Sequence, residues 1–119
     1  MSLVLVIGAS EKVGRYSNQA IRLLLSKGHK VFALAKREGV VEGVTIDVGQ
    51  PDYSDIDTVT LYIGPKHQPE YYQYILNLKP RRVIFNPGTE NPEFVDLLNE
   101  SGVENEEACT LVLLNLGAF

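Results

Sequence analysis

Apolar, strand-like segments alternate along this chain with amphipathic, helix-like segments, and no other sequence feature constrains the fold as strongly. Residues 3–7 form a continuous apolar run that stops at Gly8, as expected of a parallel strand buried on both faces. Residues 17–27 carry apolar side chains at helical spacing, and Gly28 ends that helix. The chain therefore opens with a strand, a glycine-containing loop and a helix.

The same alternation continues through the rest of the sequence. Further strands are expected at residues 29–35, 44–48, 57–63, 82–85 and 103–106. Two more helices are expected at residues 68–78 and 92–101, each with a proline in its first turn. The short strand at 44–48 is expected at an edge of the sheet, and residues 109–119 fit either a short helix or an edge strand.

This pattern predicts an α/β fold with three layers, in which a Rossmann-like, doubly wound parallel sheet of about five or six strands lies between two layers of helices. The sequence has 119 residues and contains no internal repeat, low-complexity segment or linker. We therefore expect residues 1–119 to form one domain around one core.

Charge and cysteine content narrow the possible functions. Lysine and arginine contribute 11 residues and aspartate and glutamate 15, giving a net charge of −4, whereas a nucleic-acid-binding domain normally has a basic excess. Cys109 is the single cysteine, so no intrachain disulfide can form, which suits a reducing compartment. No apolar run approaches the ~18 residues of a membrane helix. We expect a cytoplasmic protein with neither a nucleic-acid nor a membrane partner.

Ligands of doubly wound sheets bind beyond the carboxyl ends of the strands, where the strand order reverses. That rule selects four loops of this sequence, at residues 8–16, 35–39, 64–67 and 86–90. All four contain glycine, basic residues or small polar residues. Their convergence at one edge predicts a binding site for a small molecule.

The first of these loops has the composition of a phosphate-binding turn. Gly8 allows a sharp turn after the strand, Ser10 offers a hydroxyl group beside the start of a helix, and Lys12 and Arg15 add positive charge. The glycine spacing matches neither the dinucleotide-binding fingerprint nor the P-loop. The alternative interpretation is a plain strand-to-helix turn.

The second loop discriminates between nucleotides. NAD-binding domains usually place an acidic residue at the end of the second strand, where it bonds the ribose hydroxyls. This chain has Ala35 there, followed by Lys36 and Arg37. A basic pair suits a ribose that carries an extra phosphate, as in NADP or coenzyme A. The alternative is a solvated loop with two ordinary surface charges.

Six short segments, taken in order, resemble one known family. They are Val6-Ile7-Gly8-Ala9-Ser10, Ser17, Gly28-His29-Lys30-Val31, Gly64-Pro65-Lys66-His67, Asn86-Pro87-Gly88-Thr89-Glu90-Asn91 and Glu107-Ala108-Cys109-Thr110. No single segment is diagnostic. Their order and spacing over nearly the whole chain resemble the small stand-alone CoA-binding domains, which are similar to the N-terminal domain of the succinyl-CoA synthetase alpha subunit.

The resemblance implies that coenzyme A lies across the strand ends. Its diphosphate would contact Gly8, Ala9, Ser10 and Lys12, and its adenosine phosphate would lie near Lys36 and Arg37. Pro65 and Lys66 would flank the ligand, and Asn86 and Gly88 would lie beneath its pantetheine side. Many members have an Asn-Pro-Lys stretch after the second strand, where this chain has Ala35-Lys36-Arg37, and this departure bears on the adenosine contacts.

The sequence contains no recognisable catalytic constellation. His29 and His67 lack an orienting partner in the sequence, and Ser10 lacks a base. Cys109 has apolar neighbours, which favour a buried and inert thiol, and one cysteine cannot form a zinc site. We therefore expect a non-catalytic protein that binds coenzyme A or an acyl-CoA. The alternatives are an NADP-dependent oxidoreductase, or a subunit of one, and a vestigial Rossmann interaction module.

A homodimer is a further hypothesis. Helical spacing turns Tyr72 away from the face that Tyr71 and Tyr74 share. Tyr72 and the apolar tail that ends in Phe119 are therefore the residues that we expect to contribute to a dimer surface.

Overall fold

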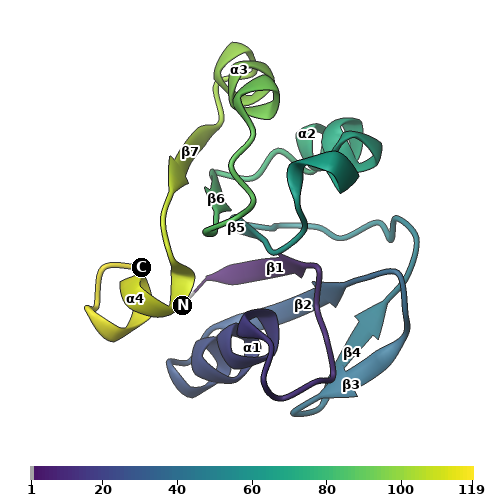
Figure 1. Cartoon of the computed structure of the whole chain (residues 1–119), viewed down its shortest axis with the longest axis vertical. Helices are drawn as coiled ribbons and strands as arrows, with labels where there is room; N and C mark the ends of the chain where they lie inside the picture. The colour runs from purple at the N-terminus through teal and green to yellow at the C-terminus, as the bar shows by residue number, and fades with distance from the viewer. Residues whose placement is uncertain (1) are drawn as a thin grey trace.

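The computed structural model describes residues 2–119 and contains a central sheet of seven strands. The strands are β1 (Leu3–Ile7), β2 (Lys30–Leu34), β3 (Gly39–Val41), β4 (Val44–Asp47), β5 (Thr58–Leu61), β6 (Arg82–Phe85) and β7 (Glu104–Glu107). Their spatial order is β3-β4-β2-β1-β5-β6-β7 (Figure 1). The continuous apolar character of β1 is explained by its central position, where Val4 to Ile7 are fully buried.

The sheet is doubly wound about β1. This strand pairs in parallel with β2 on one side and with β5 on the other, so that Val4 lies opposite both Val31 and Thr58. The chain therefore builds one half of the sheet, returns to the centre, and builds the other half in the opposite direction. All pairs are parallel except β3 with β4. This confirms the predicted Rossmann-like α/β architecture.

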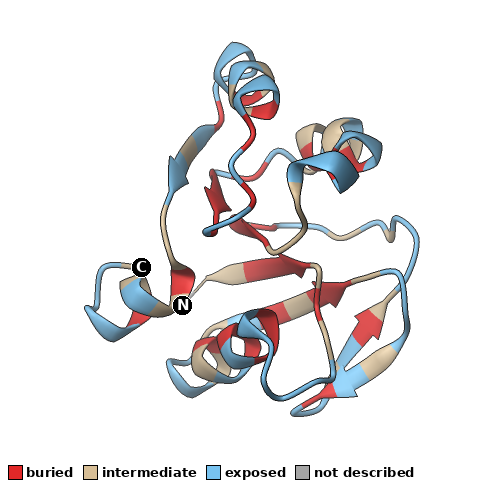
Figure 2. Cartoon of the chain, in the orientation of Figure 1, coloured by how far each residue is buried: buried red, intermediate tan, exposed pale blue. Residues whose placement is uncertain are grey.

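Helices cover both faces of the sheet (Figure 1). They are α1 (Tyr16–Ser26), α2 (Tyr72–Leu78), α3 (Pro92–Glu100) and α4 (Thr110–Asn115), and two 3-10 turns, η1 (Pro65–His67) and η2 (Pro69–Tyr71), precede α2. One core cluster joins β1 to α1 and α4 through Val4, Ile21 and Leu114. The other joins β1 to α2 and α3 through Leu5, Ile75 and Phe94. Buried residues concentrate in the central strands, as Figure 2 shows.

Two expectations about the strands were wrong. Segment 44–48 is not an edge strand, because β3 pairs with it in antiparallel register and takes the edge. Glu42 and Gly43 connect these strands with φ angles of 50° and 81°, as a two-residue hairpin turn requires. The additional hairpin strand raises the total to seven instead of five or six. The other uncertain segment, 109–119, contains the short helix α4.

The two residues suggested for a dimer surface have partners within the chain. The ring of Tyr72 stacks on Phe94 with a centroid separation of 4.5 Å. Phe119 lies 5.1 Å from the ring of His29, and the Arg82 guanidinium lies 4.6 Å from the centroid of Phe119. A homodimer therefore stays a prediction, and it would use the exposed remainder of these side chains.

Candidate functional site

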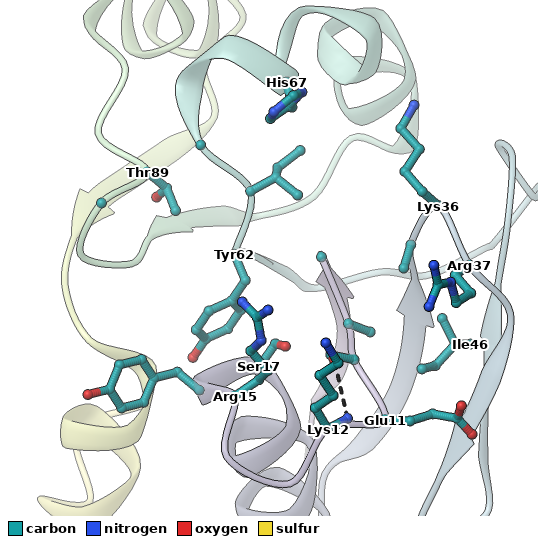
Figure 3. Close-up of a pocket in the computed structure, with 18 of the residues that line it drawn as sticks. Glu11, Lys12, Arg15, Ser17, Lys36, Arg37, Ile46, Tyr62, His67 and Thr89 are labelled. Atoms are coloured by element: carbon teal, nitrogen blue, oxygen red, sulfur yellow. Dashed lines mark hydrogen bonds between the residues drawn. The ribbon is translucent and has the colours of Figure 1, made fainter.

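A pocket of about 870 Å³ opens at the carboxyl ends of β1, β2 and β5, where the two halves of the sheet diverge (Figure 3). Its walls come from the glycine loop between β1 and α1, the loop after β2, and the loops after β5 and β6. The volume falls within the roughly 300–1,000 Å³ typical of small-molecule sites. The topology therefore forms a pocket where the sequence loops were expected to converge.

The structure brings seven of the ten predicted site residues into the lining. They are Gly8, Ala9, Ser10, Lys12, Lys36, Arg37 and Gly88. Three others do not line the pocket. Pro65 and Lys66 are exposed in η1, and Asn86 is buried below the loop after β6.

Asn86 has all its amide groups committed to the protein interior. Its Nδ2 donates to Thr60 Oγ1 at 2.6 Å and to the Leu61 carbonyl at 2.8 Å, and its Oδ1 accepts from the Thr110 backbone N–H at 2.9 Å. The side chain therefore ties β6 to β5 and to the start of α4. It supports the loop from below and offers no free polar group to a ligand.

Gly8 is required by both its conformation and its packing. Its φ of +96° is strained for any L side chain, and a Cβ atom built there would lie 2.9 Å from the Tyr62 carbonyl carbon and oxygen. The Gly8 N–H donates to the Leu34 carbonyl at 2.9 Å. The glycine thus lets β1 turn closely between the ends of β2 and β5, and this turn forms the floor of the pocket.

The start of α1 faces the pocket without a cap. Among residues 2–119, no side chain caps this helix and no acidic residue lies in its first turn. The start of α3 differs, because Asn91 Oδ1 accepts from the Phe94 N–H at 3.3 Å and Glu93 lies in the first turn. The positive end of the α1 dipole is therefore left for an external anion.

A second buried side chain holds the glycine loop against α1. Asn18 is fully buried, and its Nδ2 donates to the Ser10 carbonyl at 2.8 Å while its Oδ1 accepts from Arg22 at 2.8 Å. The Ser10 hydroxyl accepts from the Lys12 N–H at 3.1 Å. The sequence analysis missed Asn18, because its role depends on a contact eight residues away and follows from no motif.

The cations at the pocket differ in how they are paired. Within the described chain, Lys12, Arg15 and Arg37 form no ion pair. Lys36 points away from Arg37 (Figure 3), and its Nζ lies 2.6 Å from Glu70 Oε1 across the mouth of the pocket. The hydrogen bond to Glu70 raises the pKa of Lys36. Three unpaired cations at one rim make it attractive to an anion.

Positive charge is absent from the other end of the pocket. No lysine or arginine that lines the pocket comes from the loops after β5 and β6, and Lys66, in the loop after β5, is exposed outside the lining. Gly64, Gly88 and Thr89 line that side, with the exposed His67 at the rim. The pocket therefore has a basic half near the glycine loop and a largely uncharged half between the loops after β5 and β6.

Two carboxylates, those of Glu11 and Glu38, line the basic half, and neither was among the predicted site residues. Glu11 Oε2 accepts a hydrogen bond from the Val40 N–H at 2.9 Å, which links the glycine loop to β3. A Cβ atom at Gly39 would lie only 2.5 Å from Glu11 Cδ, so the glycine leaves room for this contact. Because β3 was not predicted, the sequence offered no signal for Glu11.

Tyr62 forms part of the pocket wall, and its hydroxyl is buried. Burial raises the pKa of Tyr62 to about 12, so the phenol is neutral near pH 7. Among residues 2–119 its hydroxyl oxygen is the one buried side-chain polar atom without a hydrogen-bond partner. At neutral pH Tyr62 therefore presents a protonated phenol to the pocket wall and cannot serve as a base.

The described residues contain no cluster of side chains that could bind a metal ion, and the single cysteine is only half-buried. Cys109, which was expected to be a buried and inert thiol, is half-buried and directly precedes α4. Within residues 2–119, no three His, Cys, Asp or Glu side chains are grouped to hold a metal ion. In the same residues, no helix has the length and apolarity needed to span a membrane.

Comparison with known proteins connects this architecture to a family. The sequence model of a family described as "CoA binding domain" matches residues 2–115. No curated protein matches the chain. A crystal structure described as an uncharacterized protein is 46% identical, has a TM-score of 0.98, and is matched over 100% of this chain and 98% of its own.

More distant structures share the fold alone. A conserved hypothetical protein from Pyrococcus furiosus is 24% identical, with a TM-score of 0.82 over 94% of this chain and 98% of its own. A protein from Thermus thermophilus is 20% identical, with a TM-score of 0.82 over 99% of this chain and 90% of its own.

Proposed function

The chain belongs to the CoA-binding domain family, and on that premise we propose that it is a non-catalytic module that binds coenzyme A or an acyl-CoA in the pocket at the strand ends. The observation that carries the proposal is the basic half of the pocket. There the uncapped start of α1 lies beside Lys12 and Arg15, which have no ion-pair partner in the described chain.

The diphosphate of the ligand would occupy this basic half. Gly8, Ala9 and Ser10 bring the backbone close to the ligand, and Lys12 adds a charge that the diphosphate would neutralise. Lys36 and Arg37 follow β2, where NAD-binding domains usually have an acidic residue, and Glu38 comes only after this basic pair. The basic pair instead suits the ribose phosphate that distinguishes coenzyme A from its dephosphorylated precursor.

The pantetheine arm would lie along the uncharged half. This arm carries amide groups and no charge, and Gly64 and Gly88 allow a close approach of the backbone on that side. Pro65 and Lys66 would flank the arm from outside the lining, and Asn86 would support it from below. The division of charge in the pocket thus matches the division of charge in the ligand.

A binding role suits the site better than a catalytic one. The Ser10 hydroxyl accepts a hydrogen bond from the Lys12 N–H, but no base contacts it within residues 2–119. Tyr62 keeps its proton near pH 7 because burial raises its pKa to about 12. The family match supports coenzyme A as the ligand and gives no support to NADP.

Isothermal titration calorimetry with coenzyme A and acetyl-CoA tests the proposal. We expect saturable binding to the folded wild-type protein and a loss of about tenfold in affinity in Lys12→Gln, since one charge-assisted phosphate contact is removed. Lys79→Gln, on the exposed residue after α2, is the matched control and should bind as wild type. Absence of heat with either ligand up to millimolar concentration, in a folded protein, would overturn the proposal.

A further inference from the structure

One buried side chain, Gln68, joins the two loops that form the uncharged half of the pocket. It is only 1% exposed. Its Nε2 donates to the Ile63 carbonyl at 3.0 Å, in the loop after β5, and to the Thr89 carbonyl at 2.7 Å, in the loop after β6. Ile63 and Thr89 both line the pocket, whereas Gln68 does not. Gln68 therefore acts on the pocket through these two residues.

A third hydrogen bond connects the Gln68 side chain to Asn91, at the start of α3, and through Asn91 to Tyr72 in α2. Gln68 Oε1 accepts from Asn91 Nδ2 at 2.9 Å, and the same Nδ2 donates to the Tyr72 hydroxyl at 2.8 Å. Asn91 caps α3, and the Tyr72 ring in α2 stacks on Phe94 in α3. The amide of Gln68 is consequently fixed in one orientation by a buried network.

The network has a direct consequence for the width of the pocket. Removing the amide would leave the buried Thr89 carbonyl without this donor and would free the part-buried Ile63 carbonyl, and we expect the loops to move apart to recover hydrogen bonds. No other side chain in the described residues donates to both loops. The strand pairing and Asn86 fix the bases of the two loops, and Gln68 is the side chain that links them beyond the strand ends.

We propose that Gln68 is a positioning residue that sets the width of the uncharged half of the pocket, and so determines whether the non-phosphorylated part of a nucleotide ligand is held there. The inference rests on the proposed function, because it assumes that the ligand extends from the basic half into the uncharged half. It adds that binding of the two parts of the ligand is separable, since the side-chain hydrogen bonds of Gln68 go to Ile63, Thr89 and Asn91 and to neither the glycine loop nor the loop after β2.

Two ligands separate these contributions. Coenzyme A fills both halves of the pocket, whereas adenosine 3′,5′-bisphosphate is confined to the basic half. Gln68→Met keeps the length of the side chain and removes all three hydrogen bonds. We expect its affinity for coenzyme A to fall about tenfold, comparable to the loss of one well-placed hydrogen bond, while its affinity for the bisphosphate stays within about twofold of wild type.

A second variant and a control guard against a general loss of stability. Asn91→Asp keeps an acceptor to cap α3 but cannot donate to Gln68 Oε1. The Gln68 amide must then rotate, which breaks its bonds to Ile63 and Thr89. We expect the same selective loss of coenzyme A binding. Thr58→Val removes a fully buried hydroxyl at the opposite end of the sheet and should leave the affinities for both ligands unchanged.

Calorimetry on the folded variants decides the question. Equal losses for the two ligands, or no loss for either, would overturn the role of Gln68 while leaving the proposed function in place. If Gln68→Met does not fold, Asn91→Asp provides the same comparison. If the folded wild-type protein binds neither ligand, the proposed function fails first and the inference fails with it.

Discussion

The Glu11 carboxylate accepts a hydrogen bond of 2.9 Å from the Val40 N–H, so a negative charge is fixed inside the half of the pocket that holds Lys12 and Arg37. The contact ties the glycine loop to the edge hairpin. It also opposes the binding of an anion, because the carboxylate and a bound phosphate would repel each other.

Neutralising this carboxylate should therefore strengthen binding. Glu11→Gln keeps an oxygen that accepts from Val40, and we expect coenzyme A to bind about threefold more tightly at low ionic strength. Calorimetry at two salt concentrations measures the effect. Glu100→Gln, an exposed change of equal charge at the end of α3, should not alter the affinity. An equal gain in both variants would show that net charge, and not the position of Glu11, is responsible.

Gly8→Ala should destabilise the protein by roughly 2–4 kcal/mol, since it combines a left-handed backbone conformation with a clash against the Tyr62 carbonyl. Urea unfolding followed by circular dichroism measures the loss. Gly14→Ala is the matched control, because its φ is not positive and nothing lies within 4 Å of the added Cβ. A free energy of unfolding for Gly8→Ala equal to that of Gly14→Ala would contradict the packing described for the loop.

Glu70 should compete with a phosphate on the ligand for Lys36, because its carboxylate lies 2.6 Å from the ammonium group. We expect Glu70→Gln to tighten the binding of coenzyme A by about two- to threefold at low salt and to leave dephospho-coenzyme A unaffected. Competition titrations with both ligands test this. Equal tightening of the two ligands would argue against contact between Lys36 and the ribose phosphate.

The ion pair between Asp57 and Arg81 should make stability depend on pH below neutrality. Arg81 Nε and Nη2 lie 2.9 and 3.1 Å from the two carboxylate oxygens, and these hydrogen bonds lower the pKa of Asp57. The stabilisation is present above the pKa of Asp57 in the unfolded chain and is lost as the pH falls through its lower folded value.

Asp57→Asn should therefore lower the free energy of unfolding by about 1 kcal/mol at pH 7, a figure that allows for the partial exposure of the pair. The deficit should shrink toward zero near pH 2. Urea unfolding at both pH values measures it, with the exposed Asp96→Asn as the control. If the difference in unfolding free energy between Asp57→Asn and the wild type did not change with pH, the charge of the Asp57 carboxylate would contribute nothing to stability.

The sequence predicted the parts of this molecule that depend on local patterns. The buried run of β1, the glycine that ends it, and the Asn91–Pro92 start of α3 all depend on residues close together in the chain, and the structure has each of them. The edge strand β3 was missed because it is only three residues long, too short for alternation to be evident. The turn that joins it to β4, Glu42-Gly43, is also not one of the residue pairs that mark a two-residue hairpin in a sequence.

The candidate site was predicted only as far as loops can be assigned to strand ends. The topology brings the glycine loop and the loop after β2 to one pocket, as expected. Lys36 and Glu70 are 34 positions apart in the chain, and Gln68 and Thr89 are 21 positions apart, and no local pattern encodes such partners. The family resemblance placed Asn86 beneath the pantetheine side, and nothing in the sequence indicated that its side chain bonds inward to Thr60 and Leu61.

The most direct test of the account is a ¹H–¹⁵N NMR titration of the folded wild-type protein with coenzyme A. We expect saturable shifts of the backbone amides of residues 8–12, 35–37, 63–64 and 88–89, which belong to the four loops around the pocket. The amides of β7 and of the end of α3, away from the pocket, should not move. No shifts at millimolar coenzyme A, or shifts confined to residues outside these loops, would contradict the assignment of the pocket as the ligand site.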